Sequence, residues 1–224
     1  MIRFASNEDV IELKSMWYSI FGDEMSYIDL FFDEIFSCDN TLVYEKYGDI
    51  AAMLYIVDYS YKQNEKVYKL SYLYALATKD IYRGKGIMNE LLDEATKLSK
   101  ERDKDALMLI PVDEKLLKYY KKRGFETIKS LMPIKLNGEY ECEQITVDEI
   151  KVESGVVLSK EQIHFLKSLM KLEKVNLYSF KRQGRVCRYE LAKNANSNEK
   201  HTIMMKFITN FTVFDEDIIS LLLV

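Results

Sequence analysis

The stretch from residue 67 to residue 112 constrains the fold more than any other part of this chain. It contains an extended run (67–78), a turn with two glycines, an amphipathic helix that ends near Arg102, and a short apolar run (106–112). The apolar run has the length and composition of a strand that is buried on both faces. A strand, a helix and a second strand in this order usually form a right-handed crossover between parallel strands. The sequence therefore predicts parallel pairing at the centre of a mixed sheet.

Hydrophobic periodicity predicts the elements on both sides of this crossover. Before it, we expect a strand at 1–5, a helix capped by Asn7, a helix at 26–36, and strands at 41–47 and 50–58 joined by a turn at Gly48-Asp49. After it, Asp113 is a good N-cap for a helix that Gly124 ends, and a strand at 125–136 follows. The predicted order is β-α-α-β-β-β-α-β-α-β, which is an α/β fold with a mixed central sheet flanked by helices.

The character of the chain changes after residue 136. A polar linker at 137–144 leads to a helix that Ser159 caps, with Gln162 in the capping-box position. Strand-like runs follow at 186–191 and 201–209, and the chain ends in an apolar run, IISLLLV. We predict two parts, a first domain at 1–136 and a smaller α+β segment at 137–224. The second part is too short to bury a stable hydrophobic core of its own, so we expect it to pack on the first.

Composition excludes several classes of function. The formal net charge is −4 with both signs interspersed, which does not indicate a nucleic-acid partner. The three cysteines are far apart and the two histidines lack metal-ligand spacing, so we expect no metal site and a reducing compartment. No apolar stretch is long enough to span a bilayer. We therefore expect a cytoplasmic protein without a membrane partner.

The glycine turn, RGKG at residues 83–86, matches neither of two common glycine-rich nucleotide-binding loops. A P-loop needs Ser or Thr after Gly-Lys, and a dinucleotide fingerprint needs a third glycine where Asn89 stands. Two interpretations stay open on the residues alone. One is a basic turn that faces solvent, and the other is an anion site made by amides at a helix N-terminus, with charge added by Arg83 and Lys85.

Two motifs resemble the GCN5-related N-acetyltransferase (GNAT) family. ATKDIYRGKGI is similar to that family's acetyl-CoA loop, with Arg83, Gly86 and Met88 at the motif positions, although Met88 replaces a small residue. LIPVDEKLLKYYKKRGFE is similar to its second signature, with Tyr120, Gly124 and a following Phe. The resemblance covers residues 1–136, and the predicted element order is that family's order. The bulky Met88 and the extra C-terminal segment also resemble the enhanced-intracellular-survival branch of the family.

This resemblance implies a function and a set of site residues. The co-substrate would be acetyl-CoA, with its pyrophosphate on the amides of Arg83, Gly84, Lys85, Gly86, Ile87 and Met88, and its pantetheine arm along Leu76, Ala77 and Thr78. Tyr120 would be the general acid that protonates the leaving sulfur, and Tyr119 is the second choice. Tyr120 also shares a helical face with Leu116 and Leu117, so a packed core aromatic is the competing interpretation.

The general base cannot be assigned from the sequence, and removal of the amine proton by water is an equal alternative to a side-chain base. The resemblance places Glu24, Glu34 and Asp58 in segments that border the acceptor cleft, and it also points to the carboxylate of Val224 at the end of the chain. The expected function is acetyl transfer from acetyl-CoA to a primary amine of a small molecule or protein, with no metal. The alternative is an acyl-CoA-binding or sensor module without catalysis. The C-terminal segment is a candidate dimer surface, so a homodimer stays an open alternative.

Overall fold

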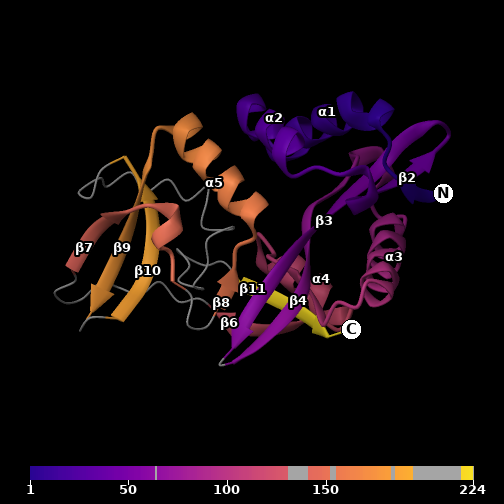
Figure 1. Ribbon diagram of the computed structural model, residues 1–224. Coiled ribbons are helices and arrows are strands. Elements are labelled where there is room, and N and C mark those ends of the chain that lie inside the picture. The colour runs from indigo at the N-terminus through magenta and orange to yellow at the C-terminus, as the bar shows by residue number, and fades with distance from the viewer. Residues whose placement is uncertain (64, 131–140, 152–154, 183–184, 194–217, 224) are drawn as a thin grey trace. The chain divides into compact units, whose positions relative to one another are not determined.

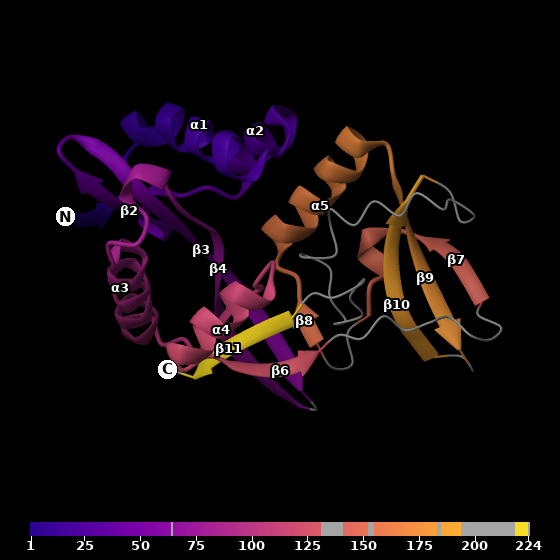
Figure 2. The same cartoon turned by 180° about the vertical axis from the view of Figure 1, so that it is seen from behind.

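The computed structural model describes residues 1–63, 65–130, 141–151, 155–182, 185–193 and 218–223. They divide into two compact units. Unit 1 contains Met1–Asp58 and Lys69–Leu109 with Leu223, and unit 2 contains Tyr59–Tyr68 and most of the chain from Ile110 onward. Figures 1 and 2 show the elements of both units from opposite sides. The predicted boundary between residues 136 and 137 lies outside the described residues and stays a prediction.

Unit 1 is built on a mixed sheet. Its strands are β1 (Ile2–Phe4), β2 (Thr41–Lys46), β3 (Asp49–Gln63), β4 (Lys66–Thr78) and β5 (Ala106–Leu109), which lie side by side in that order. The pairs β1–β2 and β2–β3 are antiparallel, whereas β4 and β5 are parallel from Leu70–Ala106 to Tyr72–Met108. Helix α3 (Ile87–Glu101) connects these two parallel strands. The predicted crossover is therefore confirmed.

Helices cover both faces of this sheet. Figures 1 and 2 show α1 (Val10–Phe21) and α2 (Met25–Glu34) on one side of β2, β3 and β4, and α3 on the other. The core under α1 and α2 is aromatic and centres on Trp17, whose ring lies 4.8 Å from that of Phe31 and 5.3 Å from that of Tyr55. Helical periodicity predicts an apolar stripe on α3 of Ile87, Leu91, Leu92, Ala95 and Leu98. The first four of these side chains are buried, whereas Leu98 is half-buried.

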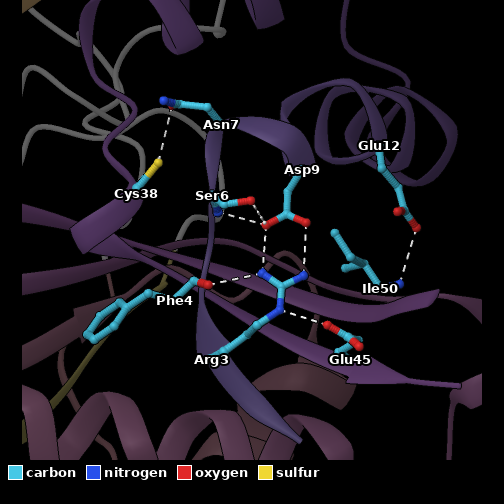
Figure 3. Close-up of polar contacts among 9 residues, drawn as sticks. All are labelled: Arg3, Phe4, Ser6, Asn7, Asp9, Glu12, Cys38, Glu45 and Ile50. Atoms are coloured by element: carbon cyan, nitrogen blue, oxygen red, sulfur yellow. Dashed lines mark hydrogen bonds and ion pairs between the residues drawn. The ribbon is translucent and has the colours of Figure 1, made fainter. Parts of the chain in front are cut away.

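Two predicted boundaries in unit 1 are wrong by one residue. Ser6 rather than Asn7 is the N-cap of the first helical segment, Asn7–Asp9, because its backbone N–H and its hydroxyl both donate to Asp9, at 2.7 and 3.1 Å (Figure 3). The turn between β2 and β3 is Tyr47-Gly48 rather than Gly48-Asp49. Both of its residues have positive φ, 57° and 79°, as in the turns that suit a two-residue hairpin.

Unit 2 contains α4 (Glu114–Lys122), α5 (Lys160–Glu173) and several short strands. Strands β7 (Glu141–Ile145), β9 (Asn176–Arg182) and β10 (Arg185–Ala192) form an antiparallel sheet with β9 in the middle. Strand β6 (Glu126–Ser130) pairs with β11 (Ile218–Leu223), and β8 (Gly155–Val157) pairs with the tip of the β3–β4 hairpin. The sequence predicted β6, β10 and β11, but it assigned residues 141–144 to a linker and missed β9.

The predicted helix caps of unit 2 are confirmed. The Asp113 carboxylate accepts a hydrogen bond from the Leu116 N–H at 2.7 Å at the start of α4. Ser159 and Gln162 form a complete capping box at the start of α5. The end of the predicted strand at 125–136 and the whole predicted strand at 201–209 lie outside the described residues.

Candidate functional site

The glycine loop, which we define as residues Arg83–Met88, joins a short 3-10 turn to α3. Gly84 and Gly86 have φ values of 74° and 79°. Residues with a Cβ rarely adopt this left-handed conformation, so both positions need glycine. Gly86 is the N-cap of α3. The two glycines therefore turn the chain sharply and bring it into the start of a long helix.

The first amides of α3 are placed to bind an anion. The Gly86 carbonyl accepts from the N–H groups of Asn89 and Glu90, at 2.9 and 3.2 Å, which begins the helix. The amides of Ile87 and Met88 precede these two, and first-turn amides have no acceptor inside a helix. A Cβ added at Gly86 would meet no heavy atom within 4 Å among the described residues. The backbone is thus open to the close approach of a negatively charged group.

Two cations flank these amides. The Arg83 Nε donates to the Thr78 carbonyl at 3.1 Å, and its Nη1 lies 2.8 Å from the Asp80 carboxylate. Its side chain is nevertheless 57% exposed, so the guanidinium remains accessible from solvent. The Lys85 ammonium donates to the Ile81 carbonyl at 2.7 Å. Both side chains donate to backbone carbonyls that precede the loop, so their positive charges stay near the N-terminus of α3. The helix dipole adds a partial positive charge at the same end.

The end of β4 is connected to this loop by one residue and a short 3-10 turn. The parallel pairing of β4 with β5 ends at Tyr72, and β4 continues for six residues to Thr78. Ala75 has a φ of 45°, a conformation that costs a non-glycine residue about 1–2 kcal/mol and bends the strand. Leu76, Ala77 and Thr78 follow this bend. The predicted cofactor residues, 76–78 and 83–88, therefore all lie in one continuous segment of unit 1.

Tyr120 is buried in unit 2. Its side chain is 6% exposed and makes edge-to-face contacts with Tyr119 and Phe125, whose ring centroids lie 5.0 and 5.7 Å away. Burial raises the pKa of the Tyr120 hydroxyl, which therefore holds its proton at neutral pH. The glycine loop belongs to unit 1, so the joint action of Tyr120 and the loop stays a prediction.

The candidate bases differ in their surroundings. Asp58 contacts the Lys104 ammonium at 2.7 Å and is thus engaged in an ion pair. Glu24 is exposed and precedes α2, and Glu34 is half-buried at the end of that helix. Val224 lies outside the described residues. The surroundings of the three described carboxylates do not single out one of them as the general base.

Sequence analysis did not predict an ion-pair network that surrounds Lys79, between β4 and the glycine loop. The Lys79 ammonium contacts Glu12 at 2.7 Å and also contacts Asp49. Glu12 also accepts from the Ile50 N–H at 3.2 Å. Residues so far apart in the chain give no local pattern, so no sequence signal pointed to this network.

The described parts of both units lack a metal-binding cluster and a membrane-spanning helix. Within these residues, no three or more His, Cys, Asp or Glu side chains are grouped so that they could hold a metal ion. No helix in the same residues is long and apolar enough to cross a membrane.

Comparisons with known proteins place the chain in a family. A family model described as "Acetyltransferase (GNAT) domain" matches residues 1–128. Among solved structures, a GCN5-related N-acetyltransferase from Anabaena variabilis is 15% identical, with a TM-score of 0.55 over 85% of this chain and 53% of that one. A probable N-acyltransferase from Enterococcus faecalis is 11% identical, with a TM-score of 0.62 over 88% and 55%. Eis1 from Mycobacterium abscessus is 9% identical, with a TM-score of 0.56 over 85% and 52%.

The chain thus spans about half the length of these solved proteins. No curated protein sequence matches it. At these identities the structural likenesses show a shared fold, so the narrower resemblance to the survival-type branch stays a prediction. The match to the family model covers more than half of the chain, and with the observed element order it confirms the predicted α/β fold class. The chain therefore belongs to the GNAT acetyltransferase family, a family of acyltransferases.

Proposed function

We propose that this protein transfers an acetyl group from acetyl-CoA to a primary amine of a small molecule or a protein. The observation that carries the proposal is the glycine loop, in which left-handed Gly86 opens the first amides of α3 beside Arg83 and Lys85. An amide cradle of this kind suits the pyrophosphate of CoA, and family membership supports acetyl-CoA over other anions.

The residues of unit 1 fit this co-substrate along its length. The amides from Arg83 to Met88 would hold the pyrophosphate, and Arg83 and Lys85 would add charge. The backbone of Leu76–Thr78 would accompany the pantetheine arm as an additional strand, because β4 there extends beyond its pairs with β5. Acetyl-CoA itself supplies the acetyl thioester. A β4 amide near the thioester carbonyl would stabilise the oxyanion, a contribution of about 3 kcal/mol.

Tyr120 is proposed as the general acid. When the amine attacks the carbonyl carbon, a C–N bond forms, the C–S bond breaks, and the sulfur leaves with the electron pair. The phenolic proton of Tyr120 would pass to that sulfur to give the free thiol of CoA. The attacking nitrogen would lose one proton to solvent water, and the tyrosinate would regain its proton from water. Burial raises the pKa of this hydroxyl, so the group is neutral and carries the proton that it would donate, although it is then a weaker acid than an exposed tyrosine. The match of Tyr120 to the family's second signature supports the role.

The alternative is an acyl-CoA-binding module without catalysis. The observation that favours it is the packing of Tyr120, which lies among Tyr119 and Phe125 as a core aromatic does. The two functions differ in turnover. Acetyl-CoA and a panel of primary amines, with free thiol monitored, should give amine-dependent release for a transferase. Saturable CoA binding without release would support the module, and absence of CoA binding would contradict both.

A glycine variant tests the loop itself. Gly86→Glu should weaken CoA binding by at least about 100-fold, because a carboxylate would meet the pyrophosphate and block the backbone. Gly22→Glu is the matched control, since Gly22 is also left-handed, with a φ of 71°, and equally open to a Cβ among the described residues. The control carries the same backbone strain and the same charge away from the loop. Equal CoA affinity in the two variants would refute the loop assignment.

A further inference from the structure

We infer that Lys79 is a positioning residue for CoA, which sets the glycine loop through Asp49 and Tyr82 without touching the ligand. This inference rests on the proposed function. Lys79 directly follows β4 and is the last residue before the 3-10 turn Asp80–Tyr82. Its backbone N–H donates to the Ala51 carbonyl at 2.9 Å, so the main chain at this point is still held to β3.

The side chain of Lys79 joins three separate elements. Its ammonium lies 2.7 Å from Glu12 on α1 and also contacts Asp49 at the start of β3. The side chain is 28% exposed, so most of it is removed from water. An ammonium that already contacts two carboxylates is poorly suited to bind a phosphate. Its role is therefore to fix the backbone, and the charge on the loop is left to Arg83 and Lys85.

Lys79 links the 3-10 turn to the start of β3. Its ammonium contacts Asp49, and its carbonyl accepts a hydrogen bond from the Tyr82 N–H at 2.8 Å, which closes the turn. Arg83, the first residue of the glycine loop, follows directly. The Lys79–Asp49 contact thus holds the turn from which the loop leaves the sheet.

Removal of Lys79 would affect the loop in two ways. The turn would lose its side-chain connection to α1 and to the start of β3, and the Glu12 and Asp49 carboxylates would be left without their shared cation. Hydrogen bonds from amides to a phosphate depend steeply on geometry, so a displaced loop should bind CoA more weakly. Both effects act on the CoA side of the reaction and leave the amine and the chemical step unaffected.

The test compares Lys79→Met with Lys79→Arg and Lys104→Met. Calorimetry gives the Kd for CoA, and thiol release gives KM for acetyl-CoA, KM for the best amine, and kcat. Lys79→Met should raise both CoA constants at least about tenfold, with kcat and the amine KM unchanged. Lys79→Arg should recover most of the affinity, because it keeps a cation for both carboxylates. Lys104→Met removes a lysine that is only 12% exposed and contacts Asp58 at 2.7 Å, and it should leave the CoA constants unchanged.

The outcomes separate this inference from the proposed function. A wild-type protein that does not bind CoA contradicts the proposed function. A wild-type protein that binds CoA while Lys79→Met binds it equally well overturns the positioning role alone, as does an equal loss in Lys104→Met. If Lys79→Met does not fold, Asp49→Asn takes its place, since it removes one of the two carboxylate charges that Lys79 contacts and keeps the size of the side chain. A smaller rise in the Kd for CoA is then expected, and an unchanged Kd refutes the inference.

Discussion

Replacing Arg3 with Met should raise the pKa of Asp9 and destabilise the protein in a pH-dependent manner. The Arg3 guanidinium contacts Asp9 at 2.6 and 2.9 Å and Glu45 at 2.8 Å, so it connects β1 to the start of the first helical segment and to β2 (Figure 3). The hydrogen bond from Arg3 is the main cause that lowers the pKa of Asp9 from 3.8 to about 2, and contacts from Ser6 add to it. In the variant, this pKa should return toward its ordinary value.

The structure gives the size of the effect. The lowered pKa of Asp9 corresponds to about 2.4 kcal/mol at about 1.36 kcal/mol per pKa unit. The Arg3 side chain is 30% exposed and that of Asp9 is 11% exposed, so solvent screening reduces the expected contribution to about 1 kcal/mol. For a chain of 224 residues, this loss lowers the Tm by about 2–4 °C.

The sign of the pH dependence follows from the direction of the shift. A carboxylate with a lowered folded-state pKa contributes stability above its unfolded pKa of 3.8, and that contribution is lost as the pH falls through about 2. The Tm difference between wild type and Arg3→Met should therefore be full at neutral pH and shrink within this window. Lys97→Met is the control, because the Lys97–Glu94 pair is 3.5 Å apart and Lys97 is 64% exposed, so little change is expected.

Carboxyl NMR titration of Asp9 measures the pKa directly, and thermal unfolding at several pH values measures the stability. A wild-type Asp9 that titrates at 3.8 or above would refute the reasoning. A Tm difference that stays the same from neutral pH to the acid limit would refute it as well, since the contribution would then not depend on the carboxylate.

Two further predictions concern α4. Tyr120→Phe should lower turnover by about 100-fold with little change in the Kd for CoA, as loss of a general acid does, whereas Tyr119→Phe should keep most of the turnover. Comparison of kcat and of CoA affinity in both variants checks this, and full turnover in Tyr120→Phe would return Tyr120 to a packing role. Asp113→Ala should destabilise the protein by about 1 kcal/mol, because the Leu116 N–H loses its cap at 2.7 Å. Urea unfolding measures this loss, and an unchanged midpoint would show that the cap contributes nothing.

Features that depend on neighbouring residues could be predicted from the sequence. The caps at Asp113 and Ser159 are properties of four consecutive residues, and the structure confirms both. The α3 stripe follows from helical periodicity alone. The start of the first helix was misplaced because Ser6 and Asn7 are both good caps, and the choice depends on Asp9, which is three residues from Ser6. Patterns of neighbouring residues therefore predict which elements form more reliably than they predict the first residue of each element.

Features that depend on burial or on distant partners could not be predicted. Strand β9 was missed because side chains on both of its faces are buried. Leu177, Tyr178 and Ser179 are consecutive and all buried, so the expected alternation is absent. The Lys79 network joins residues that are tens of positions apart, and each of them alone resembles an ordinary surface charge. Likewise, no residue type marks the left-handed conformation of Ala75. The sequence located the glycine loop, but it did not show what supports the loop.

The division of the β3–β4 hairpin between the two units has a consequence for synthesis on the ribosome. The tip of the hairpin pairs with β8 through Ser60–Val157 and Lys62–Gly155. At about 5–20 residues per second, the roughly ninety residues between these partners take about 5–20 s to be made. During that interval the tip has an open strand edge, a feature that promotes association between chains. Lys62, Glu65 and Lys66 lie at this tip, and such charges oppose edge-to-edge pairing until β8 emerges.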